Sequence, residues 1–397
     1  LSYYLITTNF ASLKNNIIMS RGKNMEYIIH LTDKCNLNCT YCYEKRGNKD
    51  ISFEDIKNLI DYEIYRNPKY SIIFFYGGEP LLQKNMIKDT INYINTKKSN
   101  TKFYYGITTN GTLLDDDFIK YMKENNFVNI GYSIDGIRSS HNLNRLTADG
   151  KGTFDIVEEN FKKLLKSFDS VVAMSVITKN NLINLSKNVE YLIDMGVKYI
   201  HLQFDYSQDW QDEDLDEIRK QYNEVAEIYG NKILQESDVE IPLIDDKIKA
   251  YIKDDYNCND DCKLGLKTIN VGTDGNFYPC MHFVNNKDFI IGNCKDGIDI
   301  KARSNLIESS KKEIEACKNC AIRKRCKHTC ACRNYILTDD INKLSSIVCE
   351  TERIIVDIAD KMAEKLYKQN SKMFIQKYYN KDYNLLKQVA SKYGKVR

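Results

Sequence analysis

The chain is 397 residues long, with 42% hydrophobic and 28% charged residues, the balance of a globular protein with a large apolar core. Its net charge is only +3 and no apolar run reaches the roughly 18 residues of a membrane span, so neither a nucleic-acid nor a membrane partner is expected. The first 24 residues lack the apolar centre of a signal peptide, and we expect a cytoplasmic protein. Because the chain starts at Leu1, either the start is unusual or the chain is trimmed, and Met25 is an alternative start.

Short runs of β-branched and aromatic residues alternate with amphipathic helical patterns over the first 240 residues. The predicted strands are Tyr27–Thr32, Ile72–Tyr76, Phe103–Thr108, Val128–Ser133, Val171–Ile177 and Tyr199–Phe204. The first predicted helix follows a capping pattern at Ser52 and Asp55, and the others lie at Asn85–Asn95, Asp115–Glu124, Phe154–Ser167, Leu182–Met195 and Leu215–Gln235. Six such units predict an α/β fold with a parallel sheet, either open or curled into a partial barrel.

The strand–helix alternation stops near Ile241. From there to about Cys349 the sequence is rich in Cys, Asn, Asp and Lys, which is typical of a small domain held together by metal. A final amphipathic helix follows, with Ile355 and Leu366 on its apolar side, and the basic tail from Ser371 is expected to be solvated.

Thirteen cysteines in a chain without a secretion signal favour metal binding over disulfides. Cys35, Cys39 and Cys42 follow the first predicted strand directly, where α/β folds build their active sites. Three thiolates can hold a four-iron cubane cluster and leave one iron open, and an open metal position is typical of catalysis. A zinc site short of one ligand, or unrelated buried thiols, are the alternatives.

The C-x3-C-x2-C spacing after the first strand, with Tyr41 before the third Cys, resembles the signature of the radical SAM enzymes. Further segments match in order at the ends of later strands: Gly77-Gly78-Glu79-Pro80, Thr108-Thr109-Asn110-Gly111 and Ser133-Ile134-Asp135-Gly136, with His141 and Arg145 shortly after. The resemblance implies that the backbone of Gly77, Gly78 and Glu79 binds the amino group of S-adenosylmethionine, that Ser133 and Arg145 bind its carboxylate, and that Tyr41 lies against the adenine. His141 is expected to be a capping or surface residue.

The later cysteines resemble the SPASM extension of radical SAM enzymes that modify peptides and proteins. Cys262 is followed by twelve residues and then by the Gly-x4-Cys motif, Gly275 to Cys280, and a C-x2-C-x5-C-x3-C run and Cys349 follow. The resemblance implies two auxiliary iron–sulfur clusters, the nearer held by Cys262, Cys280, Cys330 and, as the best candidate for the fourth ligand, Cys258, and the farther by Cys317, Cys320, Cys326 and Cys349. A pair of zinc ribbons is the alternative, and Cys294 and Cys332 are expected to be buried thiols.

These resemblances divide the chain into an extension over residues 1–24, a partial (β/α)6 radical SAM barrel over 25–240, a SPASM domain over 241–350, and a helix with a basic tail over 351–397. They imply three [4Fe-4S] clusters and S-adenosylmethionine as cofactors. They also imply that a 5′-deoxyadenosyl radical takes a hydrogen atom from the substrate.

The same resemblances leave two main substrates. The first is a ribosomally made precursor peptide that is cross-linked through a thioether or a carbon bond. The second is a sulfatase whose Cys or Ser becomes formylglycine. In the sulfatase-maturing enzymes an acidic residue, proposed as the base, follows the Cys of the Gly-x4-Cys motif. Met281 stands there and cannot take a proton, which favours peptide maturation.

Two partners are expected besides the peptide. Only 34 residues precede Cys35, so leader recognition is expected to come from a separate protein or from elsewhere on the enzyme. The reductant is expected to be a flavodoxin or a ferredoxin. A zinc-binding scaffold that recognises nucleic acid is the hypothesis from another class, and a metal analysis separates the two, because only the enzyme would carry iron.

Overall fold

The computed structural model describes residues 24–44, 46–253 and 264–380 of the chain. Cys258 and Cys262, two of the predicted cluster ligands, lie outside the described residues. Within these ranges, no helix combines the length and the apolar character that crossing a membrane requires.

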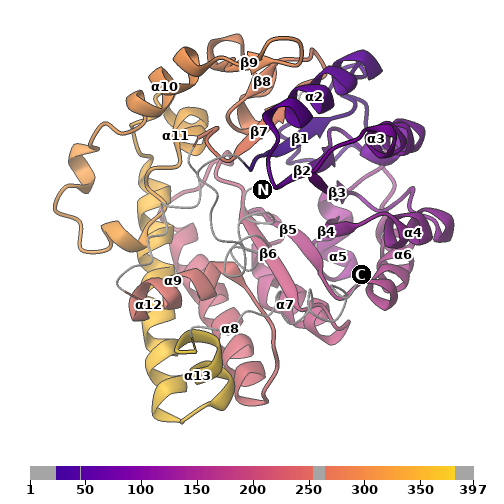
Figure 1. Cartoon of the computed structure of the whole chain (residues 1–397). Helices are drawn as coiled ribbons and strands as arrows, with labels where there is room; N and C mark the ends of the chain where they lie inside the picture. Colours follow the sequence, from indigo (N-terminus) through magenta and orange to yellow (C-terminus); the bar gives the residue numbers. More distant parts are fainter. Residues whose placement is uncertain (1–23, 45, 254–263, 381–397) are drawn as a thin grey trace.

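One eight-stranded sheet runs through the molecule in the order β6-β5-β4-β3-β2-β1-β7-β8 (Figure 1). Its strands are β1 (Glu26–His30), β2 (Tyr70–Tyr76), β3 (Lys102–Thr109), β4 (Phe127–Ser133), β5 (Val171–Ile177), β6 (Tyr199–Phe204), β7 (Thr268–Val271) and β8 (Phe277–Tyr278). All neighbours from β6 to β7 pair in parallel, and β8 returns antiparallel along β7. The six predicted strands and the α/β fold class are confirmed.

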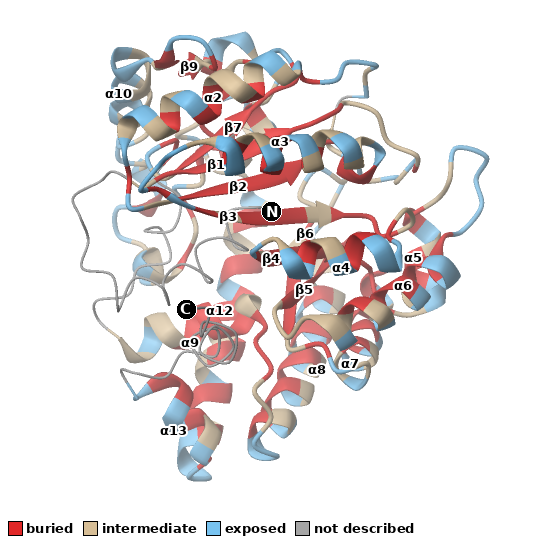
Figure 2. Cartoon of the chain, turned by 45° about the vertical axis from the view of Figure 1, so that its right-hand side comes forward, coloured by how far each residue is buried: buried red, intermediate tan, exposed pale blue. Residues whose placement is uncertain are grey.

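Helices connect the parallel strands and cover the outside of the sheet. They are α2 (Phe53–Arg66), α3 (Lys84–Thr96), α4 (Asp116–Glu124), α5 (Arg138–Asn144), α6 (Phe154–Ser167), α7 (Leu185–Asp194) and α8 (Asp214–Leu234). Figure 2 shows buried strands and helices that expose one side to solvent, as the amphipathic patterns predict. The capping pattern before α2 is real, because Asp55 N donates to Ser52 Oγ at 3.0 Å.

The region after α8 contributes two strands, β7 and β8, to the main sheet and also forms elements outside it. Its remaining elements are α9 (Pro242–Ile252), β9 (Gly292–Asn293), β10 (Gly297–Ile298), α10 (Ile300–Ser309), α11 (Ala331–Thr338), α12 (Ser346–Lys368) and α13 (Lys372–Tyr378), with short 3-10 turns between them. β7 lies beside β1 with Glu26 opposite Thr268. Sequence analysis predicted no strand here, because four residues are too few to show a period.

The prediction that the basic tail is solvated is wrong for the first part of the tail. Residues 372–378 form α13, which packs against α8 and α9. Lys377 and Tyr378 are buried, and the Lys377 ammonium contacts the Asp245 carboxylate of α9. The basic composition predicts solvent exposure only where a cation lacks a buried partner, and Asp245 supplies one. α12 packs beside α8 and α9 in the same region (Figure 1).

Candidate active site

A cavity of about 570 Å³ opens at the carboxyl ends of the parallel strands. Gln203 of β6, at one edge of the sheet, and Asn270 of β7, near the other edge, both line it. Two distant strands can share one cavity only if the sheet curves around it, so the sheet is a partial barrel. Ligand sites in parallel α/β sheets lie at this end of the strands.

The first three cysteines lie on one wall of this cavity. Their loop is held to the segment after α5, because Asn38 N donates to Leu146 O at 2.5 Å and Thr40 N donates to Asn144 O at 3.0 Å. Thr40 Oγ1 also donates to Asn144 Oδ1 at 2.7 Å. Backbone and side-chain hydrogen bonds therefore fix the loop that carries Cys35, Cys39 and Cys42.

The three thiols are half-buried to exposed and influence one another. Burial raises the pKa of Cys39 to about 11 and raises the pKa values of Cys35 and Cys42 above their ordinary value. Loading a metal cluster would therefore release protons. Among the described residues, no three Cys, His, Asp or Glu side chains lie close enough together to hold a single metal ion. The three thiols therefore line one wall without forming a closed tetrahedral site. Thiolates are the ligands that iron–sulfur clusters take, so the residue types on this wall suit such a cluster.

The Gly77-Gly78 pair brings the end of β2 against the cysteine loop. Gly78 N donates to Thr32 O at 2.8 Å and Glu79 N donates to Lys34 O at 2.9 Å. A Cβ on Gly78 would lie 2.2 Å from Lys34 O, and Gly77 has a φ of +126°, which favours glycine. Both positions therefore need glycine for a close backbone crossing at the cavity wall.

The Glu79 side chain joins the ends of β2 and β3. It is buried, and its carboxylate accepts from Thr109 Oγ1 at 2.7 Å, Asn110 N at 2.8 Å and Leu81 N at 3.0 Å. Burial raises the pKa of Glu79 to about 7, although these donors oppose the shift. Sequence analysis assigned a role to the Glu79 backbone alone, and the structure adds this bridging role of the side chain.

Arg145 and Tyr41 meet over Asp135, a buried residue after β4. Arg145 Nε lies 3.2 Å from Asp135 Oδ2, Tyr41 OH donates to the same oxygen at 2.7 Å, and the guanidinium lies 5.3 Å from the centre of the Tyr41 ring. Burial raises the pKa of Asp135, and Arg145 opposes that rise. With Ser133, also on the cavity wall, Arg145 and Tyr41 stand where a bound carboxylate and an adenine could contact them.

His141 is buried, so the surface alternative is wrong, and its contacts are those of a capping residue. Its Nδ1 accepts from Asp135 N at 3.4 Å and its Nε2 lies 3.1 Å from Thr153 Oγ1. Burial lowers its pKa well below the ordinary value, which keeps the ring neutral. The residue therefore stabilises the turn that carries Asp135.

Part of the second cysteine array reaches the same cavity. Cys280, Cys330 and Cys332 line it, and the sulfur atoms of Cys330 and Cys332 are 3.5 Å apart. Cys294 and Cys332 are buried, as predicted.

Four other predicted ligands do not line the cavity: Cys317, Cys320, Cys326 and Cys349. Burial raises the pKa of Cys317, and the neighbouring thiols of Cys349 and Cys320 raise it further. These three therefore form one group.

The cavity also holds residues that sequence reasoning missed. Tyr43 OH lies 2.5 Å from Tyr76 OH and 3.1 Å from the sulfur of Met281, and the ring of His282 packs on Tyr43 at 4.3 Å between centres. Their motif neighbours Cys42 and Cys280 could have pointed to Tyr43 and His282. Lys247 and Arg333 also line the cavity, and no sequence signal marks either of them. Gln203 lines it too, as its place at the end of the sixth predicted strand suggests.

Comparison with known proteins agrees with this geometry. The radical SAM superfamily profile matches residues 29–192. An uncharacterized protein of Methanocaldococcus jannaschii is 37% identical over 175 residues, which are 44% of this chain and 60%, less than two thirds, of that protein. The cysteine-type anaerobic sulfatase-maturating enzyme of Clostridium perfringens is 28% identical over 334 residues, covering 76% of this chain and 87% of the enzyme.

Solved structures share the fold. The structure of anSMEcpe with bound AdoMet and a Cp18Cys peptide has a TM-score of 0.75 at 22% identity, covering 87% of this chain and 99% of that one. Streptococcus suis SuiB bound to precursor peptide SuiA has a TM-score of 0.59 at 14% identity, covering 86% of this chain and 79% of that one. With three thiols on the wall of a partial barrel and a matching profile over residues 29–192, the chain carries a radical SAM domain.

Proposed function

We propose that this radical SAM enzyme modifies a ribosomally made precursor peptide, forming a thioether or carbon cross-link. The observation that carries the proposal is the shared cavity, which joins the Cys35, Cys39 and Cys42 thiols to Cys280 and Cys330 of the later array. When bound, a reduced [4Fe-4S] cluster and S-adenosylmethionine supply a 5′-deoxyadenosyl radical. The chain's own residues hold these groups, exclude water and orient the peptide.

Each predicted residue has a place in this proposal. The thiolates of Cys35, Cys39 and Cys42 hold the catalytic cluster. The backbone of Gly77, Gly78 and Glu79 accepts the amino group of S-adenosylmethionine, because a glycine pair lets the ligand approach the main chain. Ser133 and Arg145 bind the carboxylate, for which the Arg fork of donors is suited, and Tyr41 lies against the adenine.

The auxiliary clusters are part of the same proposal. Cys280 and Cys330 line the cavity, so a nearer cluster held there, with Cys258 and Cys262, would lie beside the substrate. The group of Cys317, Cys320, Cys326 and Cys349 would hold the farther one. We also propose a separate leader-binding partner and a flavodoxin or ferredoxin as the electron donor.

The residue after Cys280 favours peptide cross-linking over formylglycine formation. Met281 is buried and its sulfur accepts the Tyr43 hydroxyl at 3.1 Å, so the position offers a thioether where a carboxylate would be needed as a base. Formylglycine formation is the second candidate, because the sequence is similar to a sulfatase-maturating enzyme over 76% of this chain. Both candidates act on a peptide side chain.

The first test is release of 5′-deoxyadenosine by anaerobic enzyme with S-adenosylmethionine and dithionite. The Cys35→Ala/Cys39→Ala/Cys42→Ala variant should release none, and the Cys294→Ala variant, which changes a buried thiol away from the cavity, should keep the activity. Release by the triple variant contradicts the proposed catalytic cluster.

The second test separates the two candidates. A Cys-containing precursor peptide encoded beside the enzyme should lose two hydrogen atoms, about 2 Da, and resist thiol alkylation, because a thioether consumes the thiol. A sulfatase peptide should be unchanged. Conversion of the sulfatase peptide to an aldehyde that reacts with a hydrazide, with no change in the precursor peptide, would establish the second candidate instead.

A further inference from the structure

β6 is an edge strand of the main sheet, and its second half borders the cavity. β5 pairs with it on one side, and on the other side no strand among the described residues does. Its last four residues, 201–204, all line the cavity. β5 and β7 contribute every second residue instead, Met174 with Val176 and Thr268 with Asn270, because successive side chains of a strand point to opposite faces. A strand that lines a cavity with consecutive residues presents its backbone edge to that cavity.

The backbone groups of β6 alternate between β5 and this open edge. The segment before α9 closes the first part of the edge, because Ile200 N donates to Glu240 O at 3.0 Å and Glu240 N donates to Lys198 O at 2.7 Å. On the side of β5, Asp205 N donates to Ile177 O at 2.9 Å. The even-numbered residues of β6 therefore face the open edge, and the odd-numbered ones face β5.

Leu202 and Phe204 are the next two residues that face the open edge. Among the described residues, the N–H and C=O of Leu202 and the N–H of Phe204 have no hydrogen-bond partner, while the Phe204 carbonyl accepts from Gln203 Nε2 at 3.3 Å. Leu202 is 7% exposed and Phe204 is 5% exposed. Buried backbone groups are nearly always paired in folded proteins, so these three groups suit a partner that enters the cavity.

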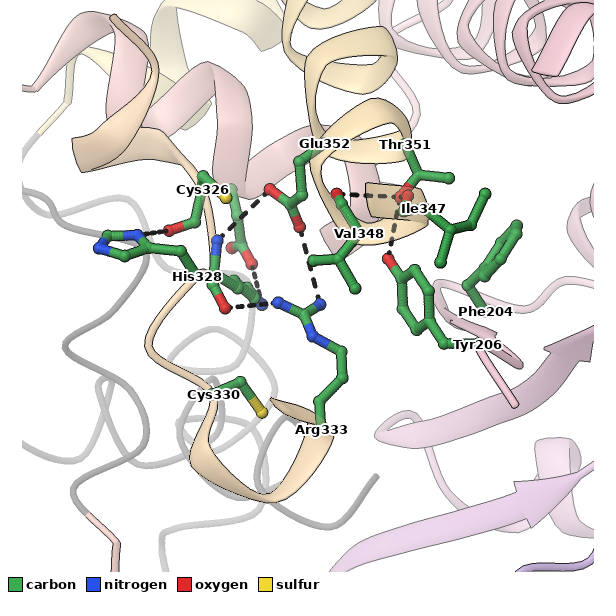
Figure 3. Close-up of polar contacts among 12 residues, drawn as sticks. Phe204, Tyr206, Cys326, His328, Cys330, Arg333, Ile347, Val348, Thr351 and Glu352 are labelled. Carbon is green, nitrogen blue, oxygen red and sulfur yellow. Dashed lines mark hydrogen bonds and ion pairs between the residues drawn. The ribbon is translucent and has the colours of Figure 1, made fainter. Parts of the chain in front are cut away.

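The open edge is held in place at both ends. Beyond β6, Tyr206 OH lies 3.3 Å from Thr351 Oγ1 of α12, and Trp210 Nε1 donates to Asp205 O at 2.7 Å. Figure 3 shows Tyr206 turned toward Thr351, with the ring of Phe204 beside it. The bonds to the segment before α9 fix the other end, so the edge is already shaped for a partner strand.

We infer that an extended stretch of the substrate peptide adds to β6 as a further strand inside the cavity. The inference rests on the proposed function, because it requires a peptide substrate. A peptide main chain offers N–H and C=O groups at every second residue, which is the pattern that Leu202 and Phe204 leave open. The thiols of Cys35, Cys39 and Cys42 line the same cavity, so a strand bound here lies in the space that they border.

The first test measures the Kd of a peptide for anaerobic, iron-loaded enzyme with S-adenosylmethionine and no reductant, by fluorescence anisotropy. The probe is whichever peptide the enzyme modifies, the precursor peptide or the sulfatase peptide, synthesised with one backbone nitrogen methylated at a time. Beside the modified residue, methylation should raise the Kd by about tenfold or more at every second position and by less than about threefold between them. The alternation is expected because every second N–H of an added strand faces β6.

The second test changes the edge of the enzyme. Leu202→Pro removes an N–H that faces the cavity and none that faces β5, and proline is tolerated on the free edge of a sheet. It should raise the Kd of the unmethylated peptide by about tenfold or more. Leu202→Val is the matched control, because it keeps the N–H, and its Kd should stay within about threefold of wild type. In wild-type enzyme, peptide binding should slow hydrogen exchange in the fragment that contains β6.

The outcomes separate this inference from the proposed function. Methylation that acts equally at every position, or at none, overturns the inference, and so does hydrogen exchange in β6 that the peptide leaves unchanged. If Leu202→Pro does not fold, the methylation series on wild-type enzyme decides. An enzyme that modifies neither peptide contradicts the proposed function itself, whereas a peptide that is modified but shows no alternation overturns the inference alone.

Discussion

Glu79 illustrates how one buried carboxylate supports the cofactor end of the barrel. Two of its three hydrogen bonds, from Thr109 Oγ1 and Asn110 N, join the end of β2 to the end of β3, and the third, from Leu81 N, is local. Because the carboxylate is buried, its pKa is about 7 instead of 4.5. The folded state therefore binds the proton of Glu79 more tightly than the unfolded state does, which gives a definite dependence of stability on pH.

Wild-type stability should fall as pH rises from 4.5 to 7, relative to a Glu79→Gln variant, because ionising the buried carboxyl is penalised only in the folded protein. The difference in unfolding free energy between the two proteins should change by about 3 kcal/mol over this range. Urea unfolding of both proteins at pH 5 and pH 8 measures it. Glu54→Gln, on the exposed side of α2, is the control, and a pH-independent difference for Glu79→Gln would contradict the burial argument.

Arg145 should matter for binding S-adenosylmethionine more than Tyr41 does. Arg145→Met removes the proposed partner of the carboxylate and leaves Asp135 buried without its cation, so the Kd should rise about ten- to hundredfold. Tyr41→Phe keeps the ring and loses one hydrogen bond, so its Kd should rise by less than about tenfold. Equilibrium dialysis with labelled cosubstrate measures both, and equal effects would mean that the ring and the charge contribute alike.

At the scale of elements, a buried polar network attaches α13 to α8 and α9. Lys377 contacts Asp245 and donates to Val239 O at 2.8 Å, and Tyr229 OH lies 2.9 Å from Asp245 Oδ1 and 2.5 Å from Tyr378 OH. Burial opposes ionisation of Asp245, but Lys377 keeps its pKa below the ordinary value. The network joins α8, α9 and α13. Because hydrogen bonds and ion pairs need defined partners, it fixes the relative position of these helices more specifically than apolar packing does.

Lys377→Met should cost about 3–5 kcal/mol of stability, because it leaves the Asp245 carboxylate buried and unpaired. Lys372→Met, on the exposed side of the same helix, should change stability by less than about 0.5 kcal/mol. Thermal unfolding of the two variants measures the difference. A Lys377→Met protein as stable as wild type would mean that Asp245 is protonated or solvated in the folded state.

For the whole molecule, the proposed function predicts its iron content. Three cubane clusters require about twelve irons per chain. A Cys317→Ala variant should lose about four of them and still cleave S-adenosylmethionine, because Cys317 lies away from the cavity that holds the catalytic thiols. Iron and sulfide analysis with the 5′-deoxyadenosine assay checks both parts. Loss of cosubstrate cleavage along with those irons would mean that the clusters depend on one another.

The sequence by itself determined the six strands of the first half and their parallel pairing, because strands that alternate with helices form parallel sheets. The position of Cys35, Cys39 and Cys42 after the first strand marked them as well, and the resemblance to radical SAM enzymes marked the Gly77-Gly78 pair and Ser133. All of them lie at the carboxyl ends of parallel strands, and therefore at one edge of the sheet.

Only the tertiary structure decided which distant residues share the cavity. The pairing of β7 with β1 and the meeting of Lys247, Arg333 and Glu352 join segments far apart in the chain. A lone Arg or Glu on a helix has no periodic signature that predicts its partner, since partners are chosen by packing between helices that the sequence pattern orients only approximately. The physical reason is that the position of a strand end follows from the local sequence, whereas the partner of a buried charge is decided by how distant helices pack together.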